Sequence, residues 1–324
     1  MGIMNGLKGW FLRTFAAARM KYIHKLEGLV SDLEGAVTAV EQSPERFEIV
    51  LEAMKLSNGN MALPGFPRAL PRLLSSMRNI KRSLVSLSEN PSDPETTAPD
   101  DFFPELVTYA RSLGVGGIGY TKVPRQWVFR DKAILHDNAI VLTMEMDRER
   151  MDKAPSPDTG LMVHETYDQL GKAANRLAEY LREQGYSAHA GHPLGGLALY
   201  PALAGLAGLG WLGANGLLIA PEFGPRHRLA AVFTSVENLP PSGNNPHEWV
   251  ANFCTKCQIC LDRCPVDAIL EEPVVHGGGL VSCIENDKCF PYFARNHGCS
   301  ICIKVCPFSY RDYSRIKAAF QGTA

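Results

Sequence analysis

The sequence predicts an α/β (α+β) core at about residues 102–250, between a helical N-terminal region at 1–88 and a cysteine-rich domain at 251–324. Three observations predict this division. Apolar residues recur at helical spacing in the first region, short apolar strands alternate with a long amphipathic helix in the core, and all nine cysteines lie in the last part. The length of 324 residues, with 45% apolar and 21% charged residues, is typical of a globular protein with roughly two domains.

The N-terminal region is predicted to contain three helices. Apolar residues in Leu26–Val40 recur at helical spacing. Ser43 followed by Pro44 is typical of an N-cap and a first helical residue, so a second helix is expected to run to about Leu56. A third, basic helix is expected at about Leu73–Leu87.

The segment 89–101 has five acids and three prolines and is predicted to be a linker. The core that follows is predicted to contain, in order, a helix at Phe102–Leu113, strands at Val115–Tyr120 and Asn138–Met146, a long helix at Leu161–Gln184 and a strand at Leu229–Thr234. The long helix has the clearest pattern, because Leu170, Leu177 and Leu181 share one face and Gly185 can end it.

Charge and targeting patterns exclude some partners. Lys and Arg number 33 against 34 Asp and Glu, so we expect no broad cationic surface for DNA, and the same neutrality argues against tRNA. The first 25 residues carry five cations and no acid, which leaves open an organellar presequence, contact with a membrane surface, or a basic helix packed on the protein itself.

Two further features bear on location. Arg13 interrupts the apolar run that a secretory signal needs, and the cysteine pattern does not resemble a disulfide framework, so we expect a cytoplasmic protein. The uncharged stretch Leu194–Pro221 contains seven glycines, whose density suits tight turns and close backbone approach to a ligand better than a membrane span.

The cysteines form two related motifs, Cys254-x2-Cys257-x2-Cys260-x3-Cys264-Pro265 and Cys299-x2-Cys302-x3-Cys306-Pro307. Cysteines at x2 spacing let one loop wrap a cubane, and the cysteine before proline ligates the other cluster. A zinc site would explain neither the third cysteine of the first motif nor the repeated Cys-Pro. The motifs therefore predict two 4Fe-4S clusters in a ferredoxin-like domain.

Counting ligands leaves one position open. One cluster is expected to take Cys254, Cys257, Cys260 and Cys306, and the other Cys264, Cys299, Cys302 and one more cysteine. Asn296 stands where the second motif would have its first cysteine. The missing ligand is therefore Cys289 or Cys283; we predict Cys289, with Cys283 as a spare thiol.

At this point the chain resembles the reductive dehalogenases. The similarity lies in Lys288-Cys289-x2-Tyr292-Phe293 ahead of Cys299, and in several strings of the core taken in the same order. These strings are Glu145-Met146-Asp147, Ala154-Pro155-Ser156, Gly185-Tyr186-Ser187-Ala188, Ala207-Gly208-Leu209-Gly210, and Ile219-Ala220-Pro221-Glu222-Phe223-Gly224-Pro225-x2-Arg228-Leu229. The string from Ala207 to Trp211 is also similar to the related epoxyqueuosine reductases. The resemblance covers about residues 102–310.

The resemblance implies a corrinoid (cobalamin) bound base-off in the core, reached by electrons from the two clusters. It also implies a small-molecule substrate and an external low-potential electron donor of the ferredoxin or flavodoxin type. The backbone expected to lie against the corrinoid is glycine-rich; the residues assigned to it are Gly208, Gly210, Trp211, Gly213, Asn215 and Gly216.

Three catalytic residues are carried over by motif order. Tyr167 matches the proton-donating tyrosine of the dehalogenases, a task that needs a nearby cation to lower its pKa; the alternative is a core residue, since Tyr167 precedes Leu170 on the apolar stripe. His192 lies near a polar pocket residue of the family, or is a buried histidine with its partners. Arg228 fits the pocket arginine, with neighbouring Arg226 as the competing choice and a surface salt bridge as the alternative role.

The sequence thus predicts a corrinoid-dependent, dehalogenase-like reductase that cleaves a small organic substrate. Two alternatives stay open. One is a two-cluster electron-transfer protein without a corrinoid, and the other is an epoxyqueuosine reductase-like enzyme acting on tRNA. Two features of the sequence differ from the epoxyqueuosine reductases: the interval from Cys289 to Cys299 is shorter, and a leucine stands at position 194, near which those enzymes carry an acid.

Overall fold

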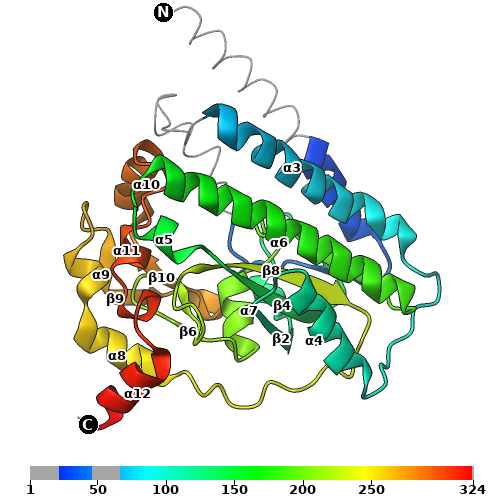
Figure 1. The fold of residues 1–324 in the computed structure, drawn as a ribbon. Coiled ribbons are helices and arrows are strands. Elements are labelled where there is room, and N and C mark those ends of the chain that lie inside the picture. The colour runs from blue at the N-terminus through cyan, green and yellow to red at the C-terminus, as the bar shows by residue number, and fades with distance from the viewer. Residues whose placement is uncertain (1–21, 46–65, 323–324) are drawn as a thin grey trace, which may run out of the picture.

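The computed structural model describes residues 22–45 and 66–322. Its centre is a four-stranded sheet in the order β2-β4-β8-β5 (Figure 1). The strands are β2 (Gly117–Lys122), β4 (Asn138–Glu145), β8 (His227–Thr234) and β5 (Ala188–Gly191). All three pairings are antiparallel, with β4 and β8 in register from Asn138↔Thr234 to Glu145↔His227. The mixed helix and strand core is therefore of the α+β kind.

Helices cover both faces of this sheet. On one face α4 (Phe102–Ser112) and α6 (Pro157–Glu183) bury Leu106, Leu170 and Leu177 against Ile140 and Val232. On the other, α7 (Tyr200–Leu206) packs with Val141 and Phe233. Because alternate strand residues point to opposite faces, a strand covered on both sides is a continuous apolar run, as β4 is.

The predicted helix at Leu26–Val40 is wrong in its second half. Residues 22–28 are helical and η1 (Leu29–Asp32) follows, but Gly35 adopts a left-handed φ of 79°. Strand β1 (Ala36–Thr38) then pairs antiparallel with β3 (Ala133–Leu135). Sheet pairing thus overrides the helical spacing. The helix expected to run to Leu56 lies outside the described residues, whereas the third appears as α3 (Phe66–Val85), continued by η2 (Ser86–Glu89).

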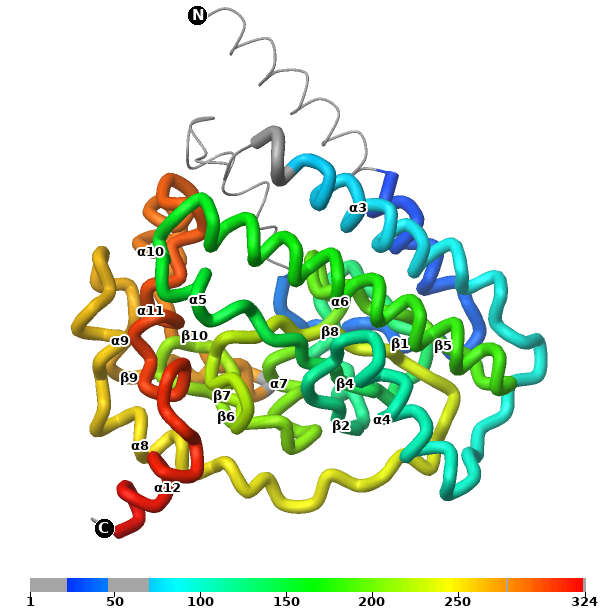
Figure 2. The backbone as a smooth tube through the Cα atoms, in the orientation of Figure 1, coloured from blue at the N-terminus to red at the C-terminus, as the bar shows by residue number. Residues whose placement is uncertain are grey.

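Helix α3 lies along α6, on the outside of the core (Figure 2). Buried Asp168 of α6 accepts a hydrogen bond from Asn79 Nδ2 of α3 at 2.9 Å. It also forms an ion pair with Lys172 Nζ, at 2.7 Å. Asn175 Nδ2 donates to the Asn79 carbonyl at 3.0 Å. The hydrogen bonds of Asn79 hold α3 against α6. They also satisfy buried polar groups, which would destabilise the fold if they had no hydrogen-bond partner.

The segment predicted as a linker contains no helix or strand between residues 90 and 100, apart from one bridge of Glu95 to Tyr186. It is nevertheless tied down. The Glu95 amide donates to the Gly185 carbonyl at 3.0 Å, and the Glu237 amide donates to the Thr96 carbonyl at 2.7 Å. This polar segment therefore packs along the core.

After α7, strands β6 (Trp211–Leu212) and β7 (Leu218–Ile219) form a small hairpin. The cysteine-rich part follows at one end of α6 (Figure 1) and consists of α8 (Trp249–Cys257), α9 (Ile259–Asp262), the hairpin β9 (Ile269–Val275) and β10 (Val281–Ile284), α10 (Asn286–Arg295), α11 (Ile301–Lys304), η5 (Pro307–Ser309) and α12 (Tyr313–Gly322). Short elements also occur at η3 (Arg125–Trp127), α5 (Arg148–Met151) and η4 (Gly277–Gly279). Among the described residues, every helix is too short or too polar to cross a bilayer.

Gly171 in the middle of α6 tests this packing. A Cβ there would lie 2.1 Å from Nε2 of buried His192, so Gly171→Ala is expected to destabilise the fold by about 1–3 kcal/mol. Gly205 of α7 is the matched control, because a Cβ there meets nothing within 4 Å, and Gly205→Ala should stabilise by about 0.5–1 kcal/mol. Urea unfolding measures both. Equal effects of the two substitutions would contradict the close contact of His192 with α6.

Candidate functional site

The eight cysteines predicted as ligands lie in two groups. In the first group, burial is the main cause that raises the pKa of Cys260 to about 12, and the neighbouring thiols of Cys254 and Cys257 add to it. Burial also raises the pKa of Cys306, with smaller contributions from Cys254, Cys257 and Cys260. In the second group, burial raises the pKa of Cys289 to about 11, and the neighbouring thiols of Cys299 and Cys264 add to this effect. Burial likewise raises the pKa of Cys302 to about 12, with smaller contributions from the other thiols of the second group and from Cys260. These thiols therefore lie in surroundings that disfavour thiolates, which a bound metal cluster would compensate.

A small cavity lies within the first group. It is lined by Cys254, Cys257, Cys260 and Cys306, together with Phe253 and Phe308 and parts of the β6–β7 hairpin. Four cysteine sulfurs around an apolar cavity are the donor set that a 4Fe-4S cubane takes. The residues present therefore fit such a cluster.

Backbone N–H groups reach several of these sulfurs. The Ala268 amide donates to Cys264 Sγ at 3.3 Å, and backbone donors at Ala214 and Ile301 oppose the burial that raises the pKa of Cys254 and Cys299. The chain around Cys299 is tightly curled, because all four residues 297–300 have left-handed φ values of 38° to 81°. Such loops cost conformational energy and typically persist where surrounding structure or a bound group requires them.

Cys283 occupies a different position from Cys289. It is buried in β10, and its Cβ lies 3.3 Å from the position a Cβ would take on Gly216, in the β6–β7 hairpin. It contributes to the raised pKa of Cys254, of the first group. Cys289 instead neighbours Cys299 and Cys264 of the second group.

The glycines predicted to face a corrinoid are also required by the backbone of the β6–β7 hairpin itself. A Cβ on Gly210, whose φ is 156°, would lie 2.3 Å from the Ile219 carbonyl oxygen. A Cβ on Gly213 would lie 2.9 Å from the Ile219 side chain. Gly208 and Gly216 have left-handed φ values of 70° and 72°. The turns and close approaches of the hairpin itself thus account for the pattern.

The two other residues of that set also contact the protein itself. Asn215 Nδ2 donates to the Cys302 carbonyl at 3.4 Å, and its Oδ1 accepts from the Leu217 amide at 3.2 Å. Half-buried Trp211 packs against the cluster that contains Cys306 and Phe308. Asn215 and Trp211 therefore join the glycine-rich hairpin to the cysteine-rich segment.

Two of the three predicted catalytic residues come together. The Arg228 guanidinium carbon lies 4.8 Å from the Tyr167 ring centroid, and both side chains are half-buried. His164, one turn earlier on α6, has its ring centroid 6.5 Å from that of Tyr167. Burial, aided by the charge of Arg228, lowers the pKa of His164 to about 4. Sequence analysis missed His164, although its i, i+3 spacing to Tyr167 is the signal that could have found it.

His192 lies on another side of α6. Its ring packs against Gly171, its Nδ1 accepts from the Leu194 amide at 3.0 Å, and burial lowers its pKa to about 4. Its Nε2 has no hydrogen-bond partner among the described residues. His192 lines a small cavity together with Glu27 and residues of α3, and neither Tyr167 nor Arg228 lines this cavity.

Arg226 ties the core to the cysteine-rich segment. Its Nε donates to the Ser309 carbonyl at 2.8 Å, and its Nη1 contacts Glu145 Oε1 at 2.8 Å and the Met146 carbonyl at 2.9 Å. The Nε and Nη1 groups of Arg226 thus bind the protein itself, whereas Arg228 lies beside Tyr167.

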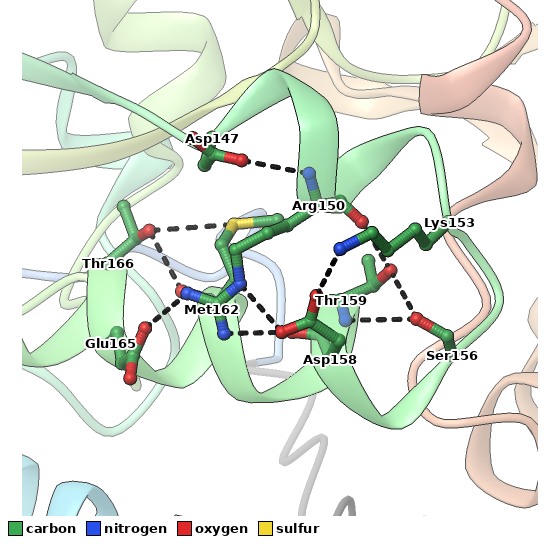
Figure 3. Close-up of polar contacts among 9 residues, drawn as sticks. All are labelled: Asp147, Arg150, Lys153, Ser156, Asp158, Thr159, Met162, Glu165 and Thr166. Atoms are coloured by element: carbon green, nitrogen blue, oxygen red, sulfur yellow. Dashed lines mark hydrogen bonds and ion pairs between the residues drawn. The ribbon is translucent and has the colours of Figure 1, made fainter.

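The start of α6 is fixed by a network around Arg150 (Figure 3). Arg150 Nε contacts Asp158 Oδ1 at 2.9 Å, its carbonyl accepts from Thr159 Oγ1 at 2.7 Å, and Ser156 caps the helix. The next turn carries Val163, which packs with the apolar cluster that includes Cys302. Tyr167 thus lies one helical turn beyond a residue that packs against the same apolar cluster as Cys302.

Comparisons with known proteins agree with this arrangement. The family described as "4Fe-4S double cluster binding domain" matches residues 253–309. A tetrachloroethene reductive dehalogenase of Desulfitobacterium hafniense is 32% identical over 215 residues, which are 60% of this chain and 37% of that protein. One from Sulfurospirillum multivorans is 28% identical over 273 residues, 69% of this chain and 53% of that protein. The predicted resemblance is confirmed.

The second predicted relative is also found. An epoxyqueuosine reductase of Atelocyanobacterium thalassa is 36% identical over 114 residues, 32% of this chain and 35% of that protein. Among solved structures, the catabolic reductive dehalogenase NpRdhA shares the fold, with a TM-score of 0.70 at 19% identity over 88% of this chain and 44% of that one. The chain thus spans roughly half or less of the length of these relatives, and the relatives of both names are reductases.

Arg226→Gln tests the tie between the core and the cysteine-rich segment. The substitution leaves the Ser309 and Met146 carbonyls without their donor, so we expect a loss of about 2–4 kcal/mol in the free energy of unfolding. Arg111→Gln, on the exposed side of α4, should change it by less than about 0.5 kcal/mol. Urea unfolding measures both variants. A stability of Arg226→Gln equal to the control would contradict this role.

Proposed function

We propose that this protein is a corrinoid-dependent reductase, similar to the reductive dehalogenases, which uses two 4Fe-4S clusters to cleave a small organic substrate reductively. The observation that carries the proposal is the cavity walled by four cysteines, in a chain whose relatives are named reductive dehalogenases. That donor set suits electron transfer by a cluster.

The proposed ligands follow the two sulfur groups. Cys254, Cys257, Cys260 and Cys306 would hold one cluster, and Cys264, Cys289, Cys299 and Cys302 the other. The neighbours that raise each pKa support the division. Cys283 is left as a spare thiol, and its place beside the first group supports this choice, since that group already has four members.

A bound corrinoid, proposed as base-off cobalamin, would supply low-potential cobalt for the reductive step. Arg228 fits a site for an added group, because its Nε is buried and has no hydrogen-bond partner among the described residues. Tyr167 is the proposed proton donor, and the Arg228 guanidinium carbon lies 4.8 Å from the centroid of its ring. The glycine-rich hairpin, with Trp211 and Asn215, remains the proposed contact surface, and His192 is proposed only as a positioning residue beneath α6.

The partners and the location are proposed on similar grounds. An external donor of the ferredoxin or flavodoxin type would reduce the clusters, since the sequence offers cluster ligands but no other recognised redox cofactor motif. All nine thiols are free of disulfides, which supports a reducing compartment such as the cytoplasm. Contact of the basic N-terminus with a membrane surface falls on residues outside the described part.

One alternative has its own observation. The match to an epoxyqueuosine reductase covers 32% of this chain and supports a related reductase acting on tRNA. The near-neutral charge argues against it. A gel shift with tRNA at physiological salt separates the two, because phosphate contacts dominate such binding.

The proposal is tested by corrinoid binding and halide release. Chain purified without oxygen and reconstituted with iron, sulfide and cobalamin should retain about one corrinoid, with the cobalt signal of the base-off form in electron paramagnetic resonance. It should then release chloride from tetrachloroethene with reduced viologen as donor. Full cluster loading without any retained corrinoid would contradict the proposal and leave the electron-transfer protein.

Tyr167→Phe removes only the phenolic hydroxyl. Turnover should fall about 10²- to 10⁴-fold, the range for loss of a general acid, while iron and corrinoid contents stay unchanged. Tyr109→Phe, on α4 and remote from Arg228, is the control and should keep turnover. Full turnover of Tyr167→Phe would assign this side chain to packing alone.

The choice of the eighth ligand is tested by two serine variants. Cys289→Ser should lose iron from one cluster, whereas Cys283→Ser should keep about eight iron per chain, as two cubanes require. Iron and sulfide analysis with electron paramagnetic resonance of the reduced protein measures this. The opposite pattern would transfer the ligand role to Cys283.

A further inference from the structure

Four cations on α8 and around the start of α12 have no carboxylate partner among the described residues. They are Lys256 of α8 and, in or next to α12, Arg311, Arg315 and Lys317. Lys256 and the two arginines are exposed, and Lys317 is half-buried. We call these four residues the α8–α12 cationic patch. Exposed charges of one sign attract a partner of the opposite sign.

Aromatic rings hold α8 and α12 side by side and bring the two lysines to one surface (Figures 1 and 2). The ring centroids of Trp249 and Phe320 are 6.0 Å apart. Lys317 Nζ lies 6.0 Å from the centroid of Trp249, and Lys256 Nζ lies 5.0 Å from that of Phe320. Contact with a ring face holds an ammonium group in place without neutralising its charge. Both charges therefore remain available to a partner.

The same aromatic layer reaches the first sulfur group. Phe253 and Phe308 line the cavity that this group encloses, and their ring centroids are 5.0 Å apart. The Phe253 centroid also lies 5.6 Å from that of Phe320, the ring beneath Lys256. Lys256 itself directly precedes Cys257 in the chain. A protein that covered the patch would therefore approach the proposed site of the first cluster.

The acids of the cysteine-rich part lie mostly outside this surface. Residues 249–322 contain seven acids, and six of them fall at 262–287, between α8 and the first turn of α10. The seventh, Asp312, accepts a hydrogen bond from the Arg315 amide at 2.8 Å and so caps α12. Glu222 of the core, which acts on Tyr313, and Glu248 at the N-cap of α8 bring the nearby acids to three. The four cations of the patch are therefore still in excess.

We propose that the α8–α12 cationic patch is the docking surface for the external electron donor, a small acidic iron–sulfur or flavin protein. This rests on the proposed function, because it names the place where the donor of that reaction would bind. One electron would leave the reduced donor and enter an oxidised cluster, with no change in any bond or proton. Electron-transfer complexes are typically small and transient, so a few steering charges are sufficient.

The probe is a plant-type 2Fe-2S ferredoxin, an acidic one-electron donor, mixed with the full cluster-loaded chain without corrinoid. Stopped-flow absorption measures the rate of cluster reduction, and isothermal titration measures the affinity for the oxidised ferredoxin. Both should fall at least about tenfold between about 0.01 M and about 1 M salt, because salt screens exposed charges. The double variant Lys256→Gln/Lys317→Gln should lower both about three- to tenfold at low salt.

Arg315→Glu is a second variant that leaves the lysines and their rings in place, and it should also lower the rate and the affinity. Arg111→Glu, on the exposed side of α4, is its matched control, because it makes the same change of charge far from α8 in the sequence. It should leave both measurements unchanged. An equal effect of Arg111→Glu, or a ferredoxin rate that does not depend on salt, overturns the proposal.

Reduced methyl viologen, a small cationic donor, separates docking from damage to the clusters. The variants should reduce their clusters with viologen as fast as the unaltered chain does. If viologen is slowed as much as ferredoxin, the lysines act in packing and the proposal is wrong. If viologen reduces no cluster even in the unaltered chain, the proposed function itself fails. The two failures are therefore distinguishable.

An anionic membrane is the competing partner for exposed cations. Sedimentation with vesicles of phosphatidylcholine and phosphatidylglycerol tests it on the same variants. The proposal predicts that Lys256→Gln/Lys317→Gln changes the reaction with ferredoxin and leaves sedimentation with vesicles as it is. The opposite result would assign the patch to a membrane surface and overturn the proposal.

Discussion

The burial of clustered cysteine sulfurs is the constraint on which the rest of this structure depends. Eight thiols converge from α8, α9, α10, α11 and the loops between them, and burial raises the pKa of most of them. Such a group is unfavourable as thiols packed without a partner and as thiolates without a cation. Bound iron would give the sulfurs a bonding partner and would compensate the charge of the thiolates. The short helices and left-handed loops surround the position that such a cluster would take.

The core holds this segment through bonds to backbone carbonyls. Arg226 donates to Ser309, Lys304 donates to Ala154 at 3.0 Å, and Asn215 donates to Cys302. Each tie joins a stretch next to a cysteine to the core or to the glycine-rich hairpin. The sulfur groups therefore have a fixed relation to the start of α6, the helix that carries Tyr167.

Local patterns explain what the sequence could predict. Cysteine spacing depends on one loop at a time, so both motifs were recognised, and the long amphipathic pattern of α6 located that helix within a few residues. Strands β4 and β8 were predicted because each is a run of β-branched and apolar residues. Such a run is typical of a strand that is covered on both faces of its sheet. Tyr167 and Arg228 were predicted through the family resemblance rather than through any periodicity.

What the sequence did not reveal depends on contacts between distant parts of the chain. The turn at Gly35 and strand β1 need β3, about a hundred residues away, so helical spacing alone misassigned them. The contact of the hairpin glycines with Ile219 is also invisible in the sequence, where their density predicted a surface for a ligand. The position of His192 against Gly171 follows from how β5 packs under α6, which no local pattern reveals.

The central claim is that two iron–sulfur clusters, and not zinc or free thiols, occupy the two sulfur groups. Mössbauer spectroscopy and iron and sulfide analysis of chain purified without oxygen test it most directly. The account predicts about eight iron and eight sulfide per chain, in two cubanes that both accept an electron. Tightly bound zinc with no sulfide, or a folded chain that takes up no iron, would contradict it.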